Sequence, residues 1–365
     1  MQRSRYQATL FLLWAVVIAA RPTSAPAGTP FVPGTGDFLQ DCCDDFEDPN
    51  WSYRYNHPKS SHEQDDKQRS PGGYSSNGLW HEGGKRGTPD LVKRVATPPG
   101  GIEGSTGALL FATKNSGIPG RISNSQQQDD LLLMFNRRLG RSIPIVWQPS
   151  CCVRVYLPPF EEWENRTGAQ FGMRADCRGR KPDGKVEEYW PGMFFLFRSE
   201  TNRNIEEDFA KLTIRADRRG HDTRSLDITE PGWWTLGMSF TADGQVHYFA
   251  SPGVDDLTAD DYLLSSFPYG MRCVTMNNFF FNVANWDNGR TWSTPWVIDD
   301  PQVFVIPPQG QTVAQLYRVK KQPQRRQQVS QNRSRQQAGS NPRTVSQPRP
   351  YSTSSGSSSN GRTQR

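Results

Sequence analysis

Hydrophobic and polar residues alternate in short runs over most of the chain. Apolar residues hold every second position from Phe209 to Ala216, from Trp233 to Phe240 and from Gln245 to Ala250. A period of two predicts a strand that buries one face. The second and third runs flank Asp243-Gly244, a pair typical of tight turns, and together they predict a β-hairpin.

Shorter apolar runs predict further strands at residues 108–113, 131–135, 152–157, 170–175, 193–197, 277–283 and 303–306, with clusters of Gly, Pro, Asn and Asp between them. A helical pattern occurs at Thr258 to Leu264, where Thr258 can cap the first turn and Asp261 follows three residues later. Many short strands with almost no helix predict an all-β fold, an antiparallel β-sandwich or jelly roll.

The flanks of this β-rich body differ from it. Residues 1–27 have the order of a secretory signal peptide: Arg3 and Arg5, an apolar run from Leu10 to Ala20, then Ala25 and Ala27. That run falls well short of the ~20 residues of a membrane-spanning helix. We therefore expect an exported protein, secreted or at the cell surface, with no transmembrane segment.

The remaining boundaries follow from composition. Residues 28–39 are a Pro/Gly-rich linker, residues 40–306 hold the sandwich, and residues 307–365 are a basic tail rich in Gln, Ser and Arg that we expect to be disordered. Within the sandwich, the stretch from Arg54 to Gly104 is rich in polar residues, Gly and Pro, and predicts long surface loops. Loops of this kind often form the binding site of a sandwich, although a plain decorated edge would have the same composition.

The six cysteines of an exported chain predict disulfides, whose connectivity the sequence alone does not fix. Cys42–Cys43 and Cys151–Cys152 are neighbours, and neighbouring residues of a strand point to opposite faces. We expect bridges from the first pair to the second, and a bridge between Cys177 and Cys273. A zinc site is the rival interpretation, but the sequence contains no C-x-x-C motif.

The net charge of +6 and the pI near 9.0 combine two opposed parts. The segment 318–365 contains basic residues and no acidic ones, whereas acidic residues outnumber basic ones from residue 28 to residue 317. A basic folded domain of the kind that binds nucleic acid is therefore not predicted. The tail instead offers long-range attraction to anionic extracellular polymers, although a solubilising role would need the same composition.

Three features follow one another along the chain: the acidic run from Asp44 to Asp48, the hairpin of Trp233 to Ala250, and a closing run from Trp296 to Val305. This order resembles the concanavalin A-like lectin/glucanase sandwiches, over roughly residues 40–306. The resemblance implies that the first and last strands pair. Members of this superfamily include lectins, adhesion modules, hydrolases and lyases, so the fold does not select a function.

Catalytic motifs are scarce. A laminarinase-type hydrolase of this superfamily would carry Glu-x-Asp-x-Glu on one strand, and this chain has no such motif. Glu188, beside Trp190, is the one catalytic candidate, because an aromatic platform could stack a sugar ring while the carboxylate acts on it.

Polar faces of the predicted strands suggest a binding surface instead. If the apolar residues point inward, the outward side chains offer hydrogen-bond donors and aromatic platforms for a sugar. The candidates are Arg154, Tyr156, Gln170, Arg174, Asp176, Trp190, His247, Asn278, Asn282 and Trp286. Trp163 and Trp292 are further candidates for exposed platforms, and an ordinary solvated face is the alternative interpretation.

No cofactor is required by these motifs, but structural calcium is an open option. Asp45, Asp48, Asp299 and Asp300 supply hard oxygen ligands, and paired terminal strands would bring them together. Resemblance to calcium-bearing sandwiches points the same way.

These patterns favour an exported, disulfide-stabilised sandwich that binds glycan or another extracellular polymer without catalysis and carries a cationic attachment tail. The alternatives are a polysaccharide-active hydrolase or lyase on the same fold, and a structural protein of the cell surface or matrix.

Overall fold

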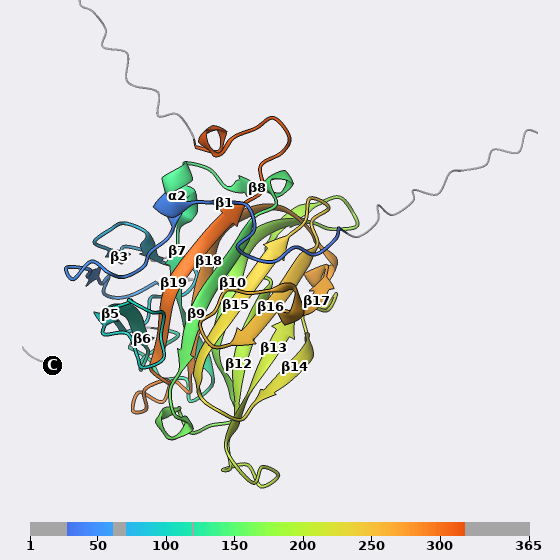
Figure 1. Cartoon of the computed structure of the whole chain (residues 1–365). Helices are drawn as coiled ribbons and strands as arrows, with labels where there is room; N and C mark the ends of the chain where they lie inside the picture. The colour runs from blue at the N-terminus through green and yellow to red at the C-terminus, as the bar shows by residue number, and fades with distance from the viewer. Residues whose placement is uncertain (1–27, 61–70, 119, 318–365) are drawn as a thin grey trace, which may run out of the picture. The chain divides into compact units, whose positions relative to one another are not determined.

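The computed structural model describes residues 28–60, 71–118 and 120–317, which form two antiparallel sheets packed face to face (Figure 1). The predicted signal peptide and most of the predicted tail lie outside the described residues. Among the described residues, no helix has the length and apolar character that crossing a membrane would require.

Sheet A has the strand order β17-β16-β15-β9-β19-β6-β5, and β1 also pairs with β19. Its strands are β1 (Asp37–Phe38), β5 (Leu91–Val95), β6 (Ala108–Ala112), β9 (Ser150–Leu157), β15 (Gly232–Phe240), β16 (Val246–Pro252), β17 (Tyr262–Ser266) and β19 (Trp296–Val305).

Sheet B has the order β14-β13-β12-β10-β18-β7-β4-β3-β2, while β11 pairs with β10 and β8 with β18. Its strands are β2 (Tyr53–Arg54), β3 (Tyr74–Ser75), β4 (Trp80–Glu82), β7 (Gln127–Leu133), β8 (Ile143–Pro144), β10 (Gly168–Arg180), β11 (Val186–Tyr189), β12 (Gly192–Arg198), β13 (Phe209–Arg215), β14 (Asp222–Ile228) and β18 (Arg272–Asn285). One short α-helix, α2 (Phe135–Leu139), follows β7.

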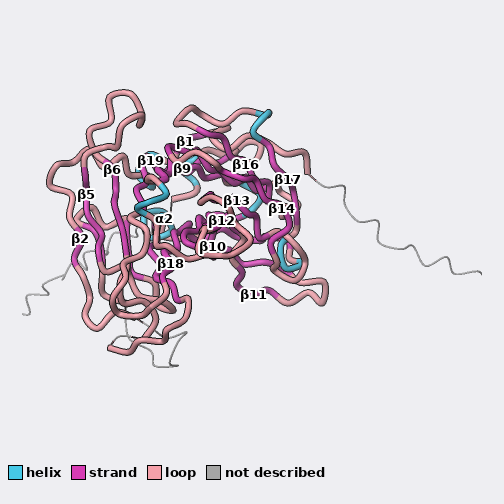
Figure 2. The backbone as a smooth tube through the Cα atoms, turned by 90° about the horizontal axis from the view of Figure 1, so that it is seen from below, coloured by secondary structure: helices cyan, strands magenta, loops and turns pink. Residues whose placement is uncertain are grey.

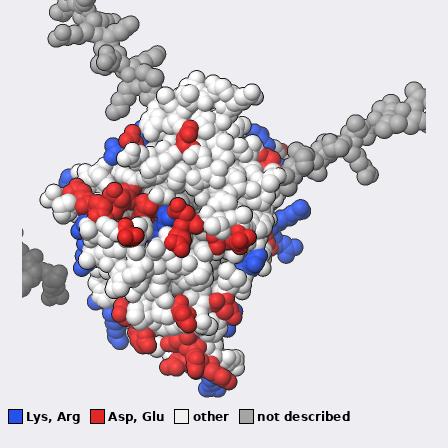
Figure 3. All heavy atoms as spheres, viewed as in Figure 1, with Lys and Arg blue, Asp and Glu red and all other residues white. Residues whose placement is uncertain are grey.

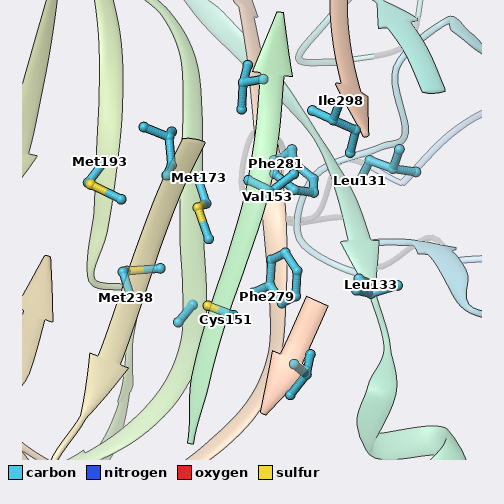
Figure 4. Close-up of a cluster of buried hydrophobic side chains, with 14 of the residues drawn as sticks. Leu131, Leu133, Cys151, Val153, Met173, Met193, Met238, Phe279, Phe281 and Ile298 are labelled. Carbon is cyan, nitrogen blue, oxygen red and sulfur yellow. The ribbon is translucent and has the colours of Figure 1, made fainter. Parts of the chain in front are cut away.

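The core lies between the two sheets, which are seen edge-on in Figure 2. Inward residues of sheet A, such as Val153 on β9, meet inward residues of sheet B, such as Met173 on β10 and Phe281 on β18 (Figure 4). Phe171 packs against Phe281 with ring centroids 5.7 Å apart. Because side chains alternate along each strand, this packing turns the polar residues between them outward.

The sandwich fold and two of its diagnostic pairings are confirmed. Asp37 and Phe38 of β1 pair with β19, and the hairpin of β15 and β16 closes around Asp243-Gly244. The resemblance to concanavalin A-like sandwiches implied that the terminal strands pair, and β1 does pair with β19. The acidic run from Asp44 to Asp48, with which the resemblance opened, forms no strand.

The predicted helix was wrong beyond its first turn. Thr258 does cap a short 3-10 helix, Ala259–Asp261, through a capping box with Asp261. Residues 262–264 instead belong to β17, because Leu264 pairs with Tyr248 at the edge of sheet A. Backbone pairing with a neighbouring strand therefore overrides the local helical signal.

The fold extends past both predicted boundaries. The expected linker 28–39 supplies β1, and the backbone N–H of Leu39 donates to Val303 O at 2.9 Å. Leu316, in the expected tail, is fully buried in the core. The expected loops between Arg54 and Gly104 contain β3, β4 and β5.

The neighbouring cysteines of β9 point to opposite faces, as expected, but no disulfide is formed among the described residues. Cys151 points into the core, and Cys152 belongs to a separate apolar cluster with Phe249 and Leu257, so the two point to opposite faces of β9. All six cysteines are free in the structure. The disulfides therefore remain a prediction.

Candidate binding site on the outer face of sheet B

The middle strands of sheet B present polar and aromatic side chains to the outside. On β10, Met173 and Ala175 point into the core, which turns Arg174 and Asp176 outward. On the neighbouring β18, Phe279 and Phe281 point inward, which leaves Asn278, Phe280 and Asn282 on the outer face. The register places Arg174 opposite Phe280 and Asp176 opposite Asn278.

A cavity of about 170 Å³ lies on this face. Its lining residues come from the loop after β4, from β7, β10, β11 and β18, and from the turn after β11: Gly83, Gly84, Lys85, Arg86, Asp130, Leu132, Asp176, Glu188, Trp190, Asn278 and Phe280. Lys85 and Glu188 keep side-chain exposures of 43% and 56%, so the cavity reaches solvent beside them.

Arg174 organises the aromatic floor of the site. Its Nε and Nη2 donate to the carbonyl oxygen of Trp190 at 3.3 and 3.1 Å. The guanidinium carbon lies 5.6–5.7 Å from the ring centroids of Trp190, Phe194 and Phe280. Burial lowers the pKa of Arg174 to about 10, so the side chain still carries its charge at neutral pH. Cation–π contacts of this kind hold the rings in place.

Asp176 joins the two central strands to the turn that carries Trp190. Its Oδ1 accepts from Trp190 Nε1 at 3.2 Å, and its Oδ2 accepts from Asn277 Nδ2 at 3.2 Å and Asn278 Nδ2 at 3.0 Å. Burial raises the pKa of Asp176, and the charge of Glu188 raises it further, while the amide donors oppose the shift. The carboxyl group therefore fixes the position of Trp190 relative to the sheet.

Trp190 is flanked by cations. Nζ of Lys85 lies 4.0 Å from the centroid of the Trp190 ring and donates to Glu188 Oε2 at 3.2 Å. Residues from two different loops thus meet over one indole.

Two buried amides on this face have unused acceptors. Asn278 is 2% exposed and lines the cavity, and its Oδ1 has no hydrogen-bond partner among the described residues. Asn282 is equally buried; its Nδ2 donates to Asp130 Oδ1 at 2.5 Å, while its Oδ1 is likewise without a partner within the described part of the chain. A buried acceptor left unpaired costs about 1–3 kcal/mol. A ligand hydroxyl that donates to Asn278 Oδ1 would remove that cost.

Two glycines let the neighbouring side chains approach. A Cβ on Gly172 would lie 2.7 Å from the ring of Phe194, and one on Gly192 would lie 2.6 Å from Cγ of Arg174. Larger residues at either position would displace the aromatic floor.

Half of the predicted binding residues come together here: Arg174, Asp176, Trp190, Asn278 and Asn282, joined by the catalytic candidate Glu188. Alternation along β10 and β18 predicted Arg174, Asp176, Asn278 and Asn282, whereas Trp190 and Glu188 were predicted as an aromatic platform with a neighbouring carboxylate. Lys85, Arg86 and Asp130 were not predicted, because the first two lie in a loop that no periodicity organises and Asp130 precedes a continuous run of leucines. Phe280 was missed because its neighbours Phe279 and Phe281 hide the alternation.

Arg154 and Tyr156 lie on the other sheet. Arg154 is buried on the outer face of sheet A, where Asp256 and Asp300 pair with it and Val254 O accepts from its Nε at 3.1 Å. Tyr156 packs against Trp233 with ring centroids 5.4 Å apart. The two side chains point outward as expected, but from the sheet opposite the cavity.

His247 was expected beside the polar face of the other strands, and this was wrong. It lies on β16 of sheet A, fully buried, with Nε2 3.0 Å from Thr241 Oγ1 and Nδ1 2.6 Å from Ser265 Oγ. Burial lowers the pKa of His247 to about 4. It is a structural histidine that stays neutral at physiological pH.

Gln170 was also expected to point outward and is instead buried. The β10–β12 register shifts between Ala169 and Phe171, and this irregularity turns the amide toward the loop. Nε2 of Gln170 donates to Glu164 O and Arg166 O, both at 3.1 Å.

The remaining tryptophans divide between surface and core. Trp286 and Trp292 are 44% and 46% exposed, as predicted, although neither lines the cavity. Trp163 was predicted to be exposed and is buried, packing edge-on against Trp296 at 4.8 Å and donating its Nε1 to Pro158 O. The polar residues on either side of it gave no sign of this packing.

The calcium candidates lie near sheet A and are held by protein partners. Asp299 accepts from Ser105 Oγ at 2.8 Å, and Asp300 faces Arg154. Asp45 and Asp48 accept from backbone N–H groups two residues on. No group of three or more acidic, His or Cys side chains suited to a metal ion occurs within the described residues. Calcium binding here stays a prediction.

No protein-family model and no curated protein sequence matches this chain. Among solved structures, it is similar to a carbohydrate esterase of a Shiga toxin-encoding bacteriophage, with 11% identity, 63% of this chain and 91% of that chain covered, and a TM-score of 0.38. An alginate lyase from Pseudomonas aeruginosa is similar at 10% identity, with 59% and 86% covered and a TM-score of 0.34. Peanut lectin is similar at 8% identity, with 60% and 99% covered and a TM-score of 0.31.

The paired terminal strands, the hairpin before the last strands and the two face-to-face antiparallel sheets define the chain as an antiparallel β-sandwich, whose strand pairing resembles that of the concanavalin A-like sandwiches. At these identities and TM-scores, the function of this chain has to be derived from its own side chains.

Proposed function

We propose that the chain is an exported, non-catalytic glycan-binding protein, and that the cavity on the outer face of sheet B holds a sugar unit. The observation that carries the proposal is a cavity lined by the indole of Trp190 and by the buried amide of Asn278, whose Oδ1 has no partner among the described residues. Sugars combine apolar ring faces with hydroxyl donors, and this cavity offers a surface for each. Its volume of about 170 Å³ suits a single ring or a chain end.

The cavity also holds charges of both signs, which hydroxyl groups can bridge. Glu188, Asp130 and Asp176 offer acceptors, while Lys85 and Arg86 offer donors. Arg86 Nη1 lies 3.7 Å from Asp130 Oδ2, so these groups already balance one another without a ligand. A neutral polyhydroxylated ring therefore fits better than a strongly charged group at this position.

The test is a glycan array followed by titration calorimetry on the best ligand. Trp190→Ala should weaken binding by about tenfold or more, since loss of an aromatic contact removes roughly 1–2 kcal/mol. Trp292→Ala is the matched control, because that indole is exposed and does not line the cavity. A blank array would leave a structural surface or matrix protein as the better interpretation.

A polysaccharide-active enzyme is the second candidate, because two carboxyl groups in different environments line one cavity. Burial raises the pKa of Asp176, whereas Glu188 is exposed beside it. Pairs of this kind can divide acid and base roles. Product release from a polysaccharide panel that disappears in Glu188→Gln would favour the enzyme; activity that survives this substitution would exclude Glu188 as the catalytic group.

A further inference from the structure

A second cavity, of about 440 Å³, lies at the far ends of β10 and β18. Its lining residues are Arg180, Lys181, Pro182, Arg218, Phe267, Gly270 and Arg272. Four of these seven are cations and none is acidic. The cavity is therefore strongly basic, although the described part of the chain carries more acidic than basic residues overall.

Two of the cations lie directly opposite each other on neighbouring strands of sheet B. Arg180 on β10 and Arg272 on β18 are direct register partners in the antiparallel pair. Like charges placed directly opposite each other destabilise a sheet. An anion bound between the two guanidinium groups would convert this repulsion into two favourable contacts.

The existing partners leave much of this charge uncompensated. Arg180 Nη1 donates to the carbonyl oxygen of Gly184 at 3.2 Å, and Arg272 Nη1 donates to the carbonyl oxygen of Asp243 at 3.1 Å. Backbone carbonyls orient a guanidinium group without neutralising it. Two of the four cations also have a carboxylate partner: Arg272 Nη1 lies 4.0 Å from Asp243 Oδ2, and Lys181 pairs with Glu187.

The geometry of Arg272 is fixed on two sides. Its guanidinium carbon lies 4.4 Å from the ring centroid of Phe267, and the hydrogen bond to Asp243 holds one edge. A guanidinium group held in this way is preorganised for an oxyanion such as sulfate or carboxylate, which accepts parallel N–H donors. Phe267 therefore supports the guanidinium group of Arg272.

We propose that this cavity is an anion subsite, which holds a sulfate or carboxylate group of a glycan bound along the outer face of sheet B. The inference rests on the proposed function, because the two cavities share β10 and β18. Asp176 and Arg180 are four residues apart on β10, a distance of about 13 Å along a strand. An acidic polysaccharide that fills the first cavity with one sugar unit can place its charge in the second.

The opposite face of the sandwich would repel such a polymer. Figure 3 looks onto the side that carries β9, β15, β16 and β19, and acidic side chains gather there in a band. Asp256 and Asp300 flank Arg154 on this face. This acidic face is therefore unfavourable for an anionic polymer.

The experiment compares dextran sulfate, carboxymethyl dextran and neutral dextran as probes for the full chain and for Arg180→Gln/Arg272→Gln. The matched control is Arg203→Gln/Arg290→Gln, which removes the same charge from two exposed arginines outside both cavities. The first double variant should lose about tenfold in affinity for one or both charged dextrans, and its slope of log affinity against log salt should fall by about 2, as counterion release requires. The control variant should bind the charged dextrans with an affinity within about twofold of the native protein's.

The two charged dextrans separate sulfate from carboxylate as the bound group. A folding check accompanies the experiment: thermal melts without an anion show whether Arg180→Gln/Arg272→Gln is folded at the assay temperature, and Arg180→Gln alone keeps the contacts of Arg272 with Phe267 and Asp243. Equal loss of affinity in both double variants would overturn the subsite and leave only net charge. An oligonucleotide that binds as tightly as dextran sulfate, with the same dependence on Arg180 and Arg272, would overturn a glycan as the occupant.

Trp190→Ala separates this proposal from the proposed function. If Trp190→Ala binds every glycan normally while the arginine pair still matters for the charged dextrans, the anion subsite stands and the sugar cavity fails. If Trp190→Ala abolishes glycan binding but the arginine pair has no effect, the subsite alone is overturned.

Discussion

Nζ of Lys85 lies 4.0 Å from the centroid of the Trp190 ring, so an ammonium group from one loop covers an indole from another. Trp190 is anchored twice: its indole Nε1 donates to Asp176 Oδ1, and its backbone carbonyl oxygen accepts from Arg174 Nη2. Lys85 is partly exposed and extends from a glycine-containing loop. A sugar ring that stacks on this face of Trp190 therefore has to displace Lys85, whereas the indole itself stays anchored.

We predict that Lys85→Ala strengthens binding of a neutral glycan. A sugar that stacks on the covered face of Trp190 has to displace the ammonium group, and an exposed cation–π contact is worth about 0.5–1 kcal/mol. Removing it should improve affinity by about two- to fivefold. Titration calorimetry measures the change, and Lys85→Arg, which keeps a cation over the ring, is the control. Weaker binding in Lys85→Ala would mean that Lys85 itself contacts the ligand.

A second prediction concerns Asn278 and its neighbour Asn277. Both donate Nδ2 to Asp176 Oδ2, at 3.0 and 3.2 Å, but only Asn278 lines the cavity with an unpartnered acceptor among the described residues. Asn278→Ala should weaken glycan binding by about 1–2 kcal/mol, the value of a hydrogen bond made in a buried site. Asn277→Ala should leave affinity unchanged while it removes the same support from Asp176. Parallel titrations and thermal melts test this, and equal losses in both variants would show that only the support of Asp176 matters.

Alternation along single strands predicted the fold and half of the site, because both depend on which face of a strand a residue occupies. Arg174 and Asp176 could be assigned to one face from the apolar residues between them, and Asn278 likewise. Alternation shows which face of a strand is buried, but it does not show to which of the two sheets the strand belongs. Arg154 and His247 alternate as regularly as Arg174, yet they lie on sheet A.

The loop side of the cavity could not be predicted for a different reason. Lys85 contacts Glu188 and Arg86 contacts Asp130, although these residues are far apart in the sequence. The contacts form because β4 pairs with β7 and β11 pairs with β10. Those pairings involve strands of three and four residues at β4 and β11, too short to leave a periodic pattern. The buried position of Gln170 depends on a shift of register, which is likewise a property of two strands and not of one.

A third prediction follows from the buried carboxyl group of Asp299. Burial raises its pKa from 3.8 to about 7, so between these values the folded state binds a proton that the unfolded state has released. The free energy of unfolding should therefore fall as the pH rises through this window. Asp299→Asn, which cannot ionise, should be more stable than the native protein by roughly 1–3 kcal/mol at pH 8, and the gap should close toward pH 4.

Urea unfolding at several pH values measures this effect, with Asp255→Asn as the exposed control. Asparagine can keep both contacts of Asp299, as acceptor for the N–H of Asp300 and as donor to Ser105 Oγ. A pH-independent difference between the native protein and Asp299→Asn would contradict the assignment. Calcium is tested in the same experiment: an ion bound at Asp299 and Asp300 would hold both carboxylates charged and would raise stability at pH 8 relative to chelator.

A fourth prediction concerns Cys177 and Cys273, which the structure places in contact as thiols. Burial raises the pKa of Cys177 well above its usual value, and a buried thiol that is rarely ionised reacts slowly with oxidants in the folded state. If the chain folds in an oxidising compartment, the bridge should form during folding, while the thiols are still exposed. Peptide mapping without reduction should then find Cys177 linked to Cys273.

The matching stability experiment uses Cys177→Ala/Cys273→Ala. A link that closes a loop of this length should stabilise the oxidised protein by about 2–4 kcal/mol. The double variant should therefore melt lower than the oxidised native protein, and by much less relative to the reduced one. Cys43 and Cys152 are the next pair to map, because the backbone N–H of Val303 on β19 donates to Cys43 Sγ at 3.2 Å and the neighbouring Gln302 pairs with Cys152. Cys42 instead lies near Tyr317 and Arg138. A link between Cys42 and Cys151 would therefore require the segment before β2 to pack differently from the structure.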